Sequence, residues 1–530
     1  MTALTSTLPQ VATPVSGLQT ALKWLFVSAL GLSILYLIFN VYAAGQPMWA
    51  LGILVLAGAG FFVYLSDIAF AYRYLFPGLA SMVVFVAFPI FFTAQIGFTN
   101  YSSAHLLSKD RATNYLLDQG WPEEARTMDF SLYPDNDGLR VVLKQSEPVE
   151  GAAPLPALVS PKLDVNLKLA KDAQPQLVAL EQSGFTPTTA LPLTEVIARR
   201  AALQNLTLLA PDKTAFNYAG VREFAPIKPV WQQATDGTLT QVETGAIYKA
   251  NMDTGYFENA KGEALQPGFK VGVGLANYMR MVTDPDFRGP FFSIFIWTVM
   301  FSGLTVLFTV AVGMPLAVLL NWEALQFKGL YRTLLFLPYA VPAFISILVF
   351  KGLFNQNFGE INVIFNALFG TKPAWFADPL LAKIMILIVN TWLGYPYIMI
   401  ICSGLIKSIP ADLYEASAVS GASPWVNFVK ITAPLIIKPL TPLLITVFAF
   451  NFNNFVVIAL LTDGRPDYLN TKLPAGTTDI LVSYTYRIAF TDAGANFGLA
   501  AAISTVIFFL VAILSLLNLK MTQSNDQRKG

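Results

Sequence analysis

Charged residues, cysteine and histidine are all scarce in this chain of 530 residues. Only 13% of the residues are charged, whereas 55% are hydrophobic, and the formal net charge is +1. A soluble domain carries about a quarter charged residues, so this composition excludes an ordinary soluble protein. The lack of a basic excess also argues against a nucleic-acid partner. We therefore expect an integral protein of a lipid bilayer.

Cys402 and His105 are the single cysteine and the single histidine. One cysteine forms no intrachain disulfide. A metal site needs several clustered ligands, and a lone imidazole in a polar stretch is ordinarily a surface residue. The sequence therefore predicts no metal site and a surface position for His105.

Motifs for catalysis are missing as well. The phosphate-binding pattern Gly-x-x-x-x-Gly-Lys-Ser/Thr occurs nowhere in the chain, and no nucleophile, base and orienting residue stand at a persuasive spacing. We predict no catalytic residue and no cofactor in this chain.

Long apolar runs are what the chain has instead. A helix needs about 20 apolar residues to cross the hydrocarbon core, and the second run follows the first too closely for the first to be a cleaved signal peptide. The predicted fold is an all-α polytopic membrane protein with eight transmembrane helices. The runs are 23–43, 47–66, 75–97, 290–321, 330–352, 380–406, 438–461 and 497–519.

Basic residues near span ends favour the cytoplasmic side of a membrane. With eight spans, the connections that carry them all share one side, so both termini are expected in the cytoplasm. Residues 99–288 and 463–495 would face outward. The basic residues are Arg73, Lys328, Arg332, Lys407, Lys430, Lys438, Lys520, Arg528 and Lys529.

Residues 99–288 form a polar insert between the third and fourth spans, with 22 of the 33 acidic and 18 of the 34 basic residues. Alternating runs such as Leu139–Lys144 and Thr238–Glu243, with a turn at Asp236-Gly237, predict a mainly β domain. One helix is expected at about Thr194–Asn205. The insert is either a stabilising cap or a docking surface for an external partner. The other expected parts are residues 1–98 (three spans), 289–521 (a core of five spans) and 522–530 (a cytoplasmic tail).

Polar side chains within three spans mark a candidate path. Buried amides cost on the order of 1 to 3 kcal/mol each without partners, yet Phe450-Asn-Phe-Asn-Asn-Phe455 interleaves three of them with aromatic rings. Amides bond hydroxyl groups and aromatic faces suit sugar rings, so the pattern favours a neutral polyhydroxylated solute over an ion. Span six offers a matching stripe with spacing i, i+3, i+4 and i+7: Asn390, Leu393, Gly394 and Tyr397.

Prolines break two of these spans at similar depth. Pro396 loosens span six, and Pro338-Tyr339 and Pro342-Ala343 interrupt span five, which is tolerated where the freed carbonyls face protein or a wet cavity. In the alternative interpretation the asparagines are hydrogen-bonded links between helices and Gly394 is a packing contact.

A charged stretch, residues 411–434, separates spans six and seven. Pro410 and Asp412 predict a helix start, and Gly421 and Pro424 predict its end. The stretch resembles the EAA loop of permease subunits of ATP-binding-cassette importers, although Ser417 replaces the second alanine and Ala433 the usual leucine. Without that resemblance, an amphipathic helix that merely links two spans explains it too. In the family the loop meets the ATPase, which implies an ATPase-coupling role for Glu415, Ala416, Ser417 and Gly421.

Four longer motifs extend the resemblance over nearly the whole chain. They are Leu337-Pro-Tyr-Ala-Val-Pro342, Asn390-Thr-Trp-Leu-Gly-Tyr-Pro-Tyr397, Ala449-Phe-Asn-Phe-Asn-Asn-Phe455 and Ser483-Tyr-Thr-Tyr-Arg-Ile-Ala-Phe490. They resemble the permease family of maltose and maltodextrin importers, which implies a type I importer permease fold. Ala343 stands where that family carries serine. The resemblance implies that the sugar site contains Tyr339, Asn390, Leu393, Gly394, Tyr397, Phe450, Asn451 and Asn454.

The resemblance also implies a bacterial inner membrane, with residues 99–288 in the periplasm. It implies four partners: a second permease subunit, a homodimeric ATPase that binds the ATP and magnesium, a periplasmic sugar-binding protein, and maltose or maltodextrin itself. Import of another oligosaccharide or glycoside stays open. An ion-coupled secondary transporter is a rival, but it would need carboxylates in the membrane, and spans four to eight contain almost none. A second rival is a membrane-anchored receptor or assembly factor that acts through the insert.

Overall fold

The computed structural model describes residues 17–66, 70–145, 155–167, 174–469, 471, 474–491 and 495–527. The chain divides into two compact units, residues 1–95 and 96–530. Seven helices in the described part are long and apolar enough to cross a membrane. The fifth predicted span is not among them because it is broken, as detailed below.

The first unit is built from apolar helices with little buried surface. α1 (Gly17–Ala43) packs on α2 (Pro47–Leu65), and a 3₁₀ turn (Phe70–Arg73) leads to α3 (Phe76–Met82), which a π-turn joins to α4 (Phe88–Gly97). Arg73 donates to the carbonyls of Val63 and Ser66 at 3.2 Å each, so a cation satisfies the C-terminal end of α2. Ala50 is the one buried residue of α1 and α2, as expected for helices solvated by lipid.

The insert is mainly β, as predicted. One sheet has the order β6-β4-β3-β2-β9-β8-β7 with β5 paired to β3, a second has the order β11-β12-β13-β14-β15, and β1 pairs with β10. The strands are β1 (Gly120–Pro122), β2 (Met128–Asp135), β3 (Gly138–Lys144), β4 (Leu158–Val159), β5 (Leu163–Asp164), β6 (Val178–Ala179), β7 (Thr207–Leu209), β8 (Ala215–Gly220), β9 (Glu223–Ala225), β10 (Ile227–Pro229), β11 (Trp231–Gln233), β12 (Leu239–Gln241), β13 (Ile247–Asn251), β14 (Tyr256–Glu258) and β15 (Ala264–Leu265).

Side chains that alternate between buried and exposed along the strands form two hydrophobic cores in the insert. Phe130 and Leu132 of β2 pack with residues of β3 in one core, and Trp231 and Phe257 belong to the other. The predicted helix near 194–205 is two short helices, α6 (Leu193–Ala198) and α7 (Arg200–Gln204). A further helix, α5 (Lys109–Leu117), was not predicted, although Ser108 caps its first turn.

His105 is buried, so its predicted surface position is wrong. The side chain is 9% exposed, its Nδ1 is 2.8 Å from Ser102 Oγ, and its ring centroid lies 4.4 Å from that of Tyr256. Burial lowers the pKa of the imidazole. No group of three or more histidine, cysteine or carboxylate side chains is placed to hold a metal ion within the described ranges.

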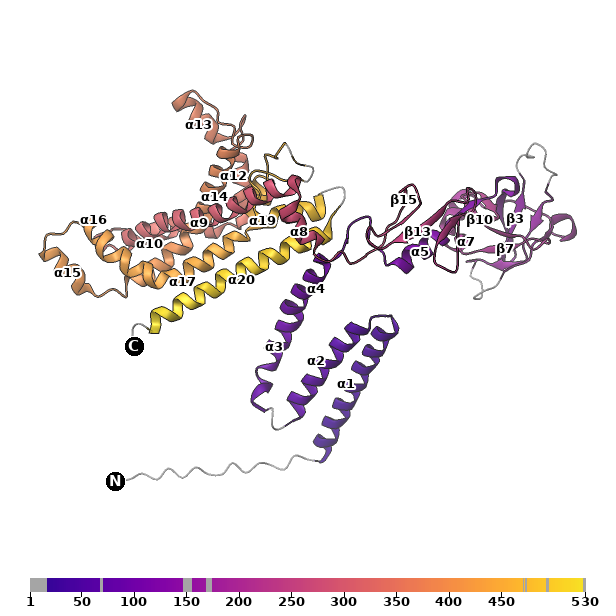
Figure 1. Cartoon of the computed structure of the whole chain (residues 1–530), viewed down its shortest axis with the longest axis horizontal. Coiled ribbons are helices and arrows are strands. Elements are labelled where there is room, and N and C mark those ends of the chain that lie inside the picture. Colours follow the sequence, from indigo (N-terminus) through magenta and orange to yellow (C-terminus); the bar gives the residue numbers. More distant parts are fainter. Residues whose placement is uncertain are drawn as a thin grey trace. The chain divides into compact units, whose positions relative to one another are not determined.

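The core of the second unit contains α8 to α20. α9, α14, α17 and α20 run alongside one another (Figure 1), with buried apolar side chains between them. The helices are α8 (Ala276–Thr283), α9 (Pro285–Asn321), α10 (Lys328–Leu335), α11 (Leu337–Ala340), α12 (Ala343–Leu353), α13 (Glu360–Phe369), α14 (Pro379–Ile406), α15 (Ala411–Val419), α16 (Pro424–Asn427), α17 (Ala433–Phe452), α18 (Phe455–Leu461), α19 (Leu481–Tyr486) and α20 (Phe497–Gln527). α9 starts five residues before the predicted span at 290, so residues 285–288 belong to this helix and not to the insert.

Two spans are interrupted near the middle. Span five is divided into α10, α11 and α12, and Val341 is extended with φ −106° and ψ 131° because the following Pro342 disfavours the helical region. The helix of span seven starts at Pro424, before the predicted span at 438, and reaches Phe452 through a π-turn at Phe428–Thr432. α17 ends at Phe452 with Asn453 as its C-cap, and α18 completes the predicted run. The second half of the 411–434 stretch is thus continuous with span seven.

A buried ion-pair cluster fixes the loop between α18 and α20. Arg487 Nη1 lies 2.8 Å from Asp479 Oδ2, and its Nη2 lies 2.6 Å from Asp467 Oδ1. Asp479 is fully buried and also accepts from Ser483 Oγ and from the backbone N–H of Gly476, each at 2.8 Å. Burial raises the pKa of the Asp479 carboxyl to about 6, and Arg487 acts against that rise.

Candidate functional site

The eight residues predicted for a sugar site line one cavity. It has a volume of about 690 Å³, within the usual range of small-molecule sites, and lies between α9, α11, α12, α14, α17 and α18. None of the residues that line it is charged. The predicted residues are Tyr339, Asn390, Leu393, Gly394, Tyr397, Phe450, Asn451 and Asn454, and Ala343 joins them.

Asn390, Asn451 and Asn454 form a hydrogen-bonded network. Asn390 Nδ2 donates to Asn451 Oδ1 at 2.7 Å, and Asn454 Nδ2 donates to Asn390 Oδ1 at 3.2 Å. Asn390 and Asn451 are each 4% exposed, and Asn451 Nδ2 also donates to the carbonyl of Val447 at 2.8 Å. The amides therefore link α14 to the broken end of α17. They also line the cavity, so both interpretations of these residues describe part of the geometry.

Gly394 has a packing role that the sequence left as an alternative. A Cβ built on it would lie 2.8 Å from Thr309 Cγ2, closer than real Cβ atoms come. Its missing side chain thus lets α14 approach α9 directly beside the cavity. A larger residue here would force the two helices apart or fill the cavity.

Three aromatic rings line the same cavity. Phe450 is 70% exposed, Tyr339 53% and Tyr397 38% in this chain, whereas the neighbouring Phe452 is buried. These rings add flat apolar surface to the cavity that the amides also line. Together the two kinds of group suit a ligand with many hydroxyls and apolar ring faces.

The sequence interpretation missed the contribution of α9. Thr305 and Thr309 line the cavity, and Thr305 Oγ1 accepts from Asn390 Nδ2 at 3.1 Å. A signal was present, because Thr298, Ser302, Thr305 and Thr309 recur every three or four residues and are all buried. A stripe of hydroxyls on one face of a membrane helix identifies the face turned toward other helices.

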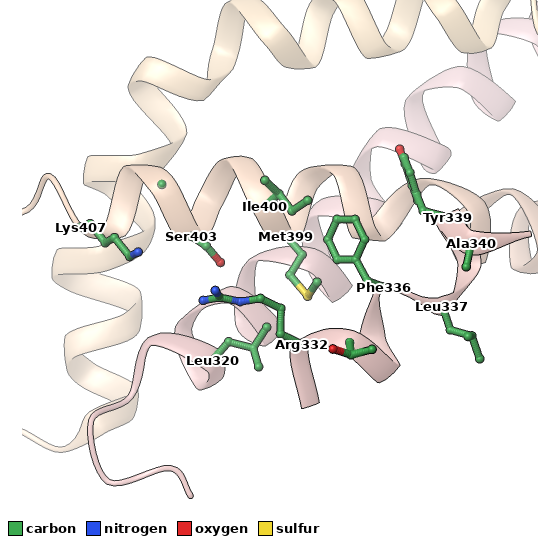
Figure 2. A pocket seen from close by; sticks show the side chains of 12 residues that line it. Leu320, Arg332, Phe336, Leu337, Tyr339, Ala340, Met399, Ile400, Ser403 and Lys407 are labelled. Carbon is green, nitrogen blue, oxygen red and sulfur yellow. The ribbon is translucent and has the colours of Figure 1, made fainter. Parts of the chain in front are cut away.

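A second cavity of about 880 Å³ lies further along α14, nearer the 411–434 stretch. Figure 2 shows its lining, with Met399, Ser403 and Lys407 on the side of α14 and Arg332 on α10. Tyr339 lines both cavities. This tyrosine therefore stands where the amide-lined cavity gives way to the one with basic residues.

The predicted coupling residues lie on and after an exposed short helix. Glu415 and Ala416 are exposed on α15, and Ser417 is half-buried with its hydroxyl bonded to Asn427 Oδ1. Gly421 has φ +73°, a left-handed conformation that favours glycine. α13 precedes α14 and α15 follows it, so the two short helices lie at opposite ends of this span (Figure 1).

The 411–434 stretch is held as one piece and presents apolar surface. Tyr414 OH lies 2.9 Å from Thr432 Oγ1, which ties α15 to the π-turn that opens the seventh span. Val419 is 91% exposed and Trp425 71%. A rigid exposed helix with apolar and acidic side chains is suited to docking on another protein.

Comparison with known proteins gives matches along nearly the whole chain. The Maltose transport system permease protein MalF P2 domain matches residues 107–274, the Binding-protein-dependent transport system inner membrane component matches residues 309–523, and the MalF N-terminal transmembrane region matches residues 21–67. The maltose/maltodextrin transport system permease protein MalF of Salmonella typhimurium is 48% identical over 95% of this chain and 96% of its own length. Its counterpart in Klebsiella aerogenes is 49% identical over 95% and 96%, and that in Yersinia pestis 48% over 95% of both.

Proposed function

The chain belongs to the MalF family of maltose/maltodextrin transport system permeases, and from this premise we propose that its amide-lined cavity carries maltose or a maltodextrin across the inner membrane. It is a non-catalytic permease subunit of an ATP-binding-cassette importer. The observation that carries the proposal is the uncharged cavity, which three asparagines and three exposed aromatic rings line. Hydroxyl groups exchange hydrogen bonds with such amides, whereas an ion would find no opposite charge.

The proposed path follows the two cavities. Sugar enters the amide-lined cavity from the periplasm, passes Tyr339 and leaves through the cavity that Arg332 and Lys407 line. The positive residues at that end favour the cytoplasm, and so do the connections that carry Arg73 and Lys430. In this orientation both termini are cytoplasmic, residues 99–288 are periplasmic and the 411–434 stretch faces the ATP-containing compartment.

The proposed partners follow from the surfaces. The exposed 411–434 stretch docks on a homodimeric ATPase that binds the ATP and magnesium, so this subunit needs no cofactor of its own. A second permease subunit completes the path, and a periplasmic sugar-binding protein docks on the insert. Because α16, the π-turn and α17 are one continuous helix from Pro424 to Phe452, displacement of the 411–434 stretch is transmitted directly to Phe450 and Asn451.

Uptake measurements test the substrate. The chain is reconstituted in liposomes with its second permease, ATPase and binding protein, and labelled maltose, maltotriose and unrelated disaccharides are offered with internal ATP. We expect ATP-dependent uptake of the α-glucosides. Absence of uptake for every glucoside, with an intact complex, would contradict the proposal.

Gly421→Ala tests the coupling role. At φ +73° an alanine is strained, which moves the chain between α15 and α16, so we expect sugar-stimulated ATP hydrolysis and uptake to fall at least about 10-fold, as for roughly 1.4 kcal/mol of lost coupling. Gly370→Ala is the matched control, because Gly370 has φ +67° at the end of α13 and no atom within 4 Å of an added Cβ. Equal losses in the two variants would attribute the effect to strain alone.

A further inference from the structure

Asn390 has no donor left for a ligand. A carboxamide carries two N–H donors and one oxygen with two acceptor positions. One N–H of Asn390 donates to Asn451 Oδ1 at 2.7 Å and the other to Thr305 Oγ1 at 3.1 Å. What remains is its oxygen, which accepts from Asn454 Nδ2 at 3.2 Å.

Thr305 engages the second N–H of Asn390 and so helps to hold the amide in one orientation. Asn451 Oδ1 is only an acceptor, so it already requires a donor from Asn390. Thr305 adds a second acceptor on the same side, from a helix that carries none of the other amides, and it is 2% exposed. If the amide turned over, its oxygen would meet Asn451 Oδ1 and one N–H would meet Asn454 Nδ2, so two bonds would be lost in a buried site.

We propose that Thr305 is a positioning residue that holds Asn390 with its carbonyl oxygen toward the cavity, and so makes this asparagine an acceptor that selects a sugar hydroxyl as donor. The inference rests on the proposed function, since it names how the same cavity recognises its sugar. The bond from Asn454 is the longest of the three between side chains. An incoming hydroxyl displaces it, and the freed Asn454 N–H then donates to another oxygen of the sugar.

At one position the site would then require a sugar group that donates a hydrogen bond. If Thr305 only filled space, the site would have no such requirement. Replacing the selected hydroxyl by fluorine keeps its size but removes its proton, so Asn390 loses its donor. Replacing Thr305 by valine keeps the shape of the side chain and removes its oxygen. Asn390 then keeps its bond to Asn451 Oδ1 but has one N–H without a partner. That N–H can approach the fluorine, so the variant tolerates the fluorinated sugar.

The experiment measures uptake kinetics for maltose and for a set of its monodeoxyfluoro derivatives in the reconstituted complex. In the wild type we expect one position at which fluorine raises KM at least about 10-fold, as a lost buried hydrogen bond requires. In Thr305→Val we expect that ratio to fall below about 3-fold, with KM for maltose itself raised and kcat little changed. Thr305→Ser, which retains an oxygen, should restore the wild-type ratio.

Thr505→Val is the matched control. Thr505 is buried on α20, and its hydroxyl donates to the carbonyl of Ala501 at 2.8 Å within its own helix. We expect the fluorine ratio to be unchanged in this variant. If Thr305→Val is not recovered in the membrane, Thr305→Ala removes the same acceptor and gives the same test.

The results of these uptake measurements distinguish the role of Thr305 from the proposed function of sugar import. An unchanged fluorine ratio in Thr305→Val or Thr305→Ala, or no sensitive position in a wild type that imports maltose, would overturn the role of Thr305 and leave the proposed function standing. A wild-type complex that imports no glucoside would refute the function itself.

Discussion

Two buried polar regions of this chain are built on opposite principles. The cluster of Arg487, Asp479 and Asp467 is charged, and its carboxylates and guanidinium compensate one another at 2.6 to 2.8 Å. The cavity network of Thr305, Asn390, Asn451 and Asn454 is neutral, and its weakest bond is 3.2 Å long. A charged cluster cannot exchange partners without leaving a charge unpaired, which suits a fixed loop. Neutral amides can exchange partners at small cost, which suits a ligand that must arrive and depart.

Removing the cation should give the largest effect on stability. Arg487→Met keeps the length of the side chain but leaves the buried Asp479 without its partner, which costs about 3 to 5 kcal/mol in comparable sites. We expect a large drop in the thermal unfolding midpoint of the purified protein in detergent. Asp467→Asn is the milder comparison, because the Asp467 side chain is 47% exposed and retains contact with solvent.

The pH dependence of the Arg487→Met variant sharpens that expectation. Loss of the guanidinium raises the pKa of Asp479 further above its ordinary value of 3.8, from about 6 in the intact protein. The folded state then binds a proton at Asp479 more tightly than the unfolded state does. The stabilisation that comes from this protonation is present at low pH and is lost as pH rises through the folded pKa. The deficit relative to wild type should be smaller at pH 5.5 than at pH 8. An equal deficit at both values would show that Asp479 is not the group left unpaired.

The contrast between the two regions also explains what the sequence could predict. The stripe Asn390, Leu393, Gly394 and Tyr397 was recognisable because its members are four residues of one helix at fixed spacing. Amides are also conspicuous in a membrane span because they are costly there. Thr305 escaped notice because threonines in membrane helices commonly bond their own backbone, as Thr309 does with the carbonyl of Thr305 at 2.8 Å.

Other features depended on information that local patterns do not carry. The ion-pair cluster joins residues up to 20 positions apart across a loop with no regular period. The helix of span seven starts 14 residues before the predicted span. Lys430, Pro434 and Lys438 indicated a polar connection there, whereas the helix continues through this stretch by way of a π-turn. The buried position of His105 requires the strand Tyr256–Glu258 to return beside it, a contact between distant parts of the chain.

Asn451→Ala should produce the next largest effect, and on transport more than on folding. It removes the acceptor of one Asn390 N–H and a group that lines the cavity, at a cost of about 1 to 3 kcal/mol. We expect KM for maltose to rise between about 5-fold and 100-fold, with a smaller shift in the unfolding midpoint than in Arg487→Met. The measurement is uptake by the reconstituted complex.

Asn453→Ala is the control for that variant. Asn453 is exposed, does not line the cavity and donates only a long 3.4 Å bond to the carbonyl of Ala449. Transport should therefore be close to that of the wild type. If the two alanine variants were equally impaired in uptake, the loss would come from a disturbed break between α17 and α18. It would not come from the missing amide of Asn451.

Ala343→Ser should give the smallest effect, and in the opposite direction. Ala343 lines the cavity as the first residue of α12, after Pro342, which offers no side-chain cap. A serine there adds a neutral hydroxyl that can bond a sugar oxygen and is worth about 0.5 to 1.5 kcal/mol, so KM for maltose should fall about 2-fold to 10-fold. The unfolding midpoint should hardly change, because the position is exposed and serine is tolerated at helix starts. If the hydroxyl instead raised KM, the bound sugar would have no hydrogen-bonding group left for it. The polar groups of the cavity would then be as fully paired as those of the charged cluster.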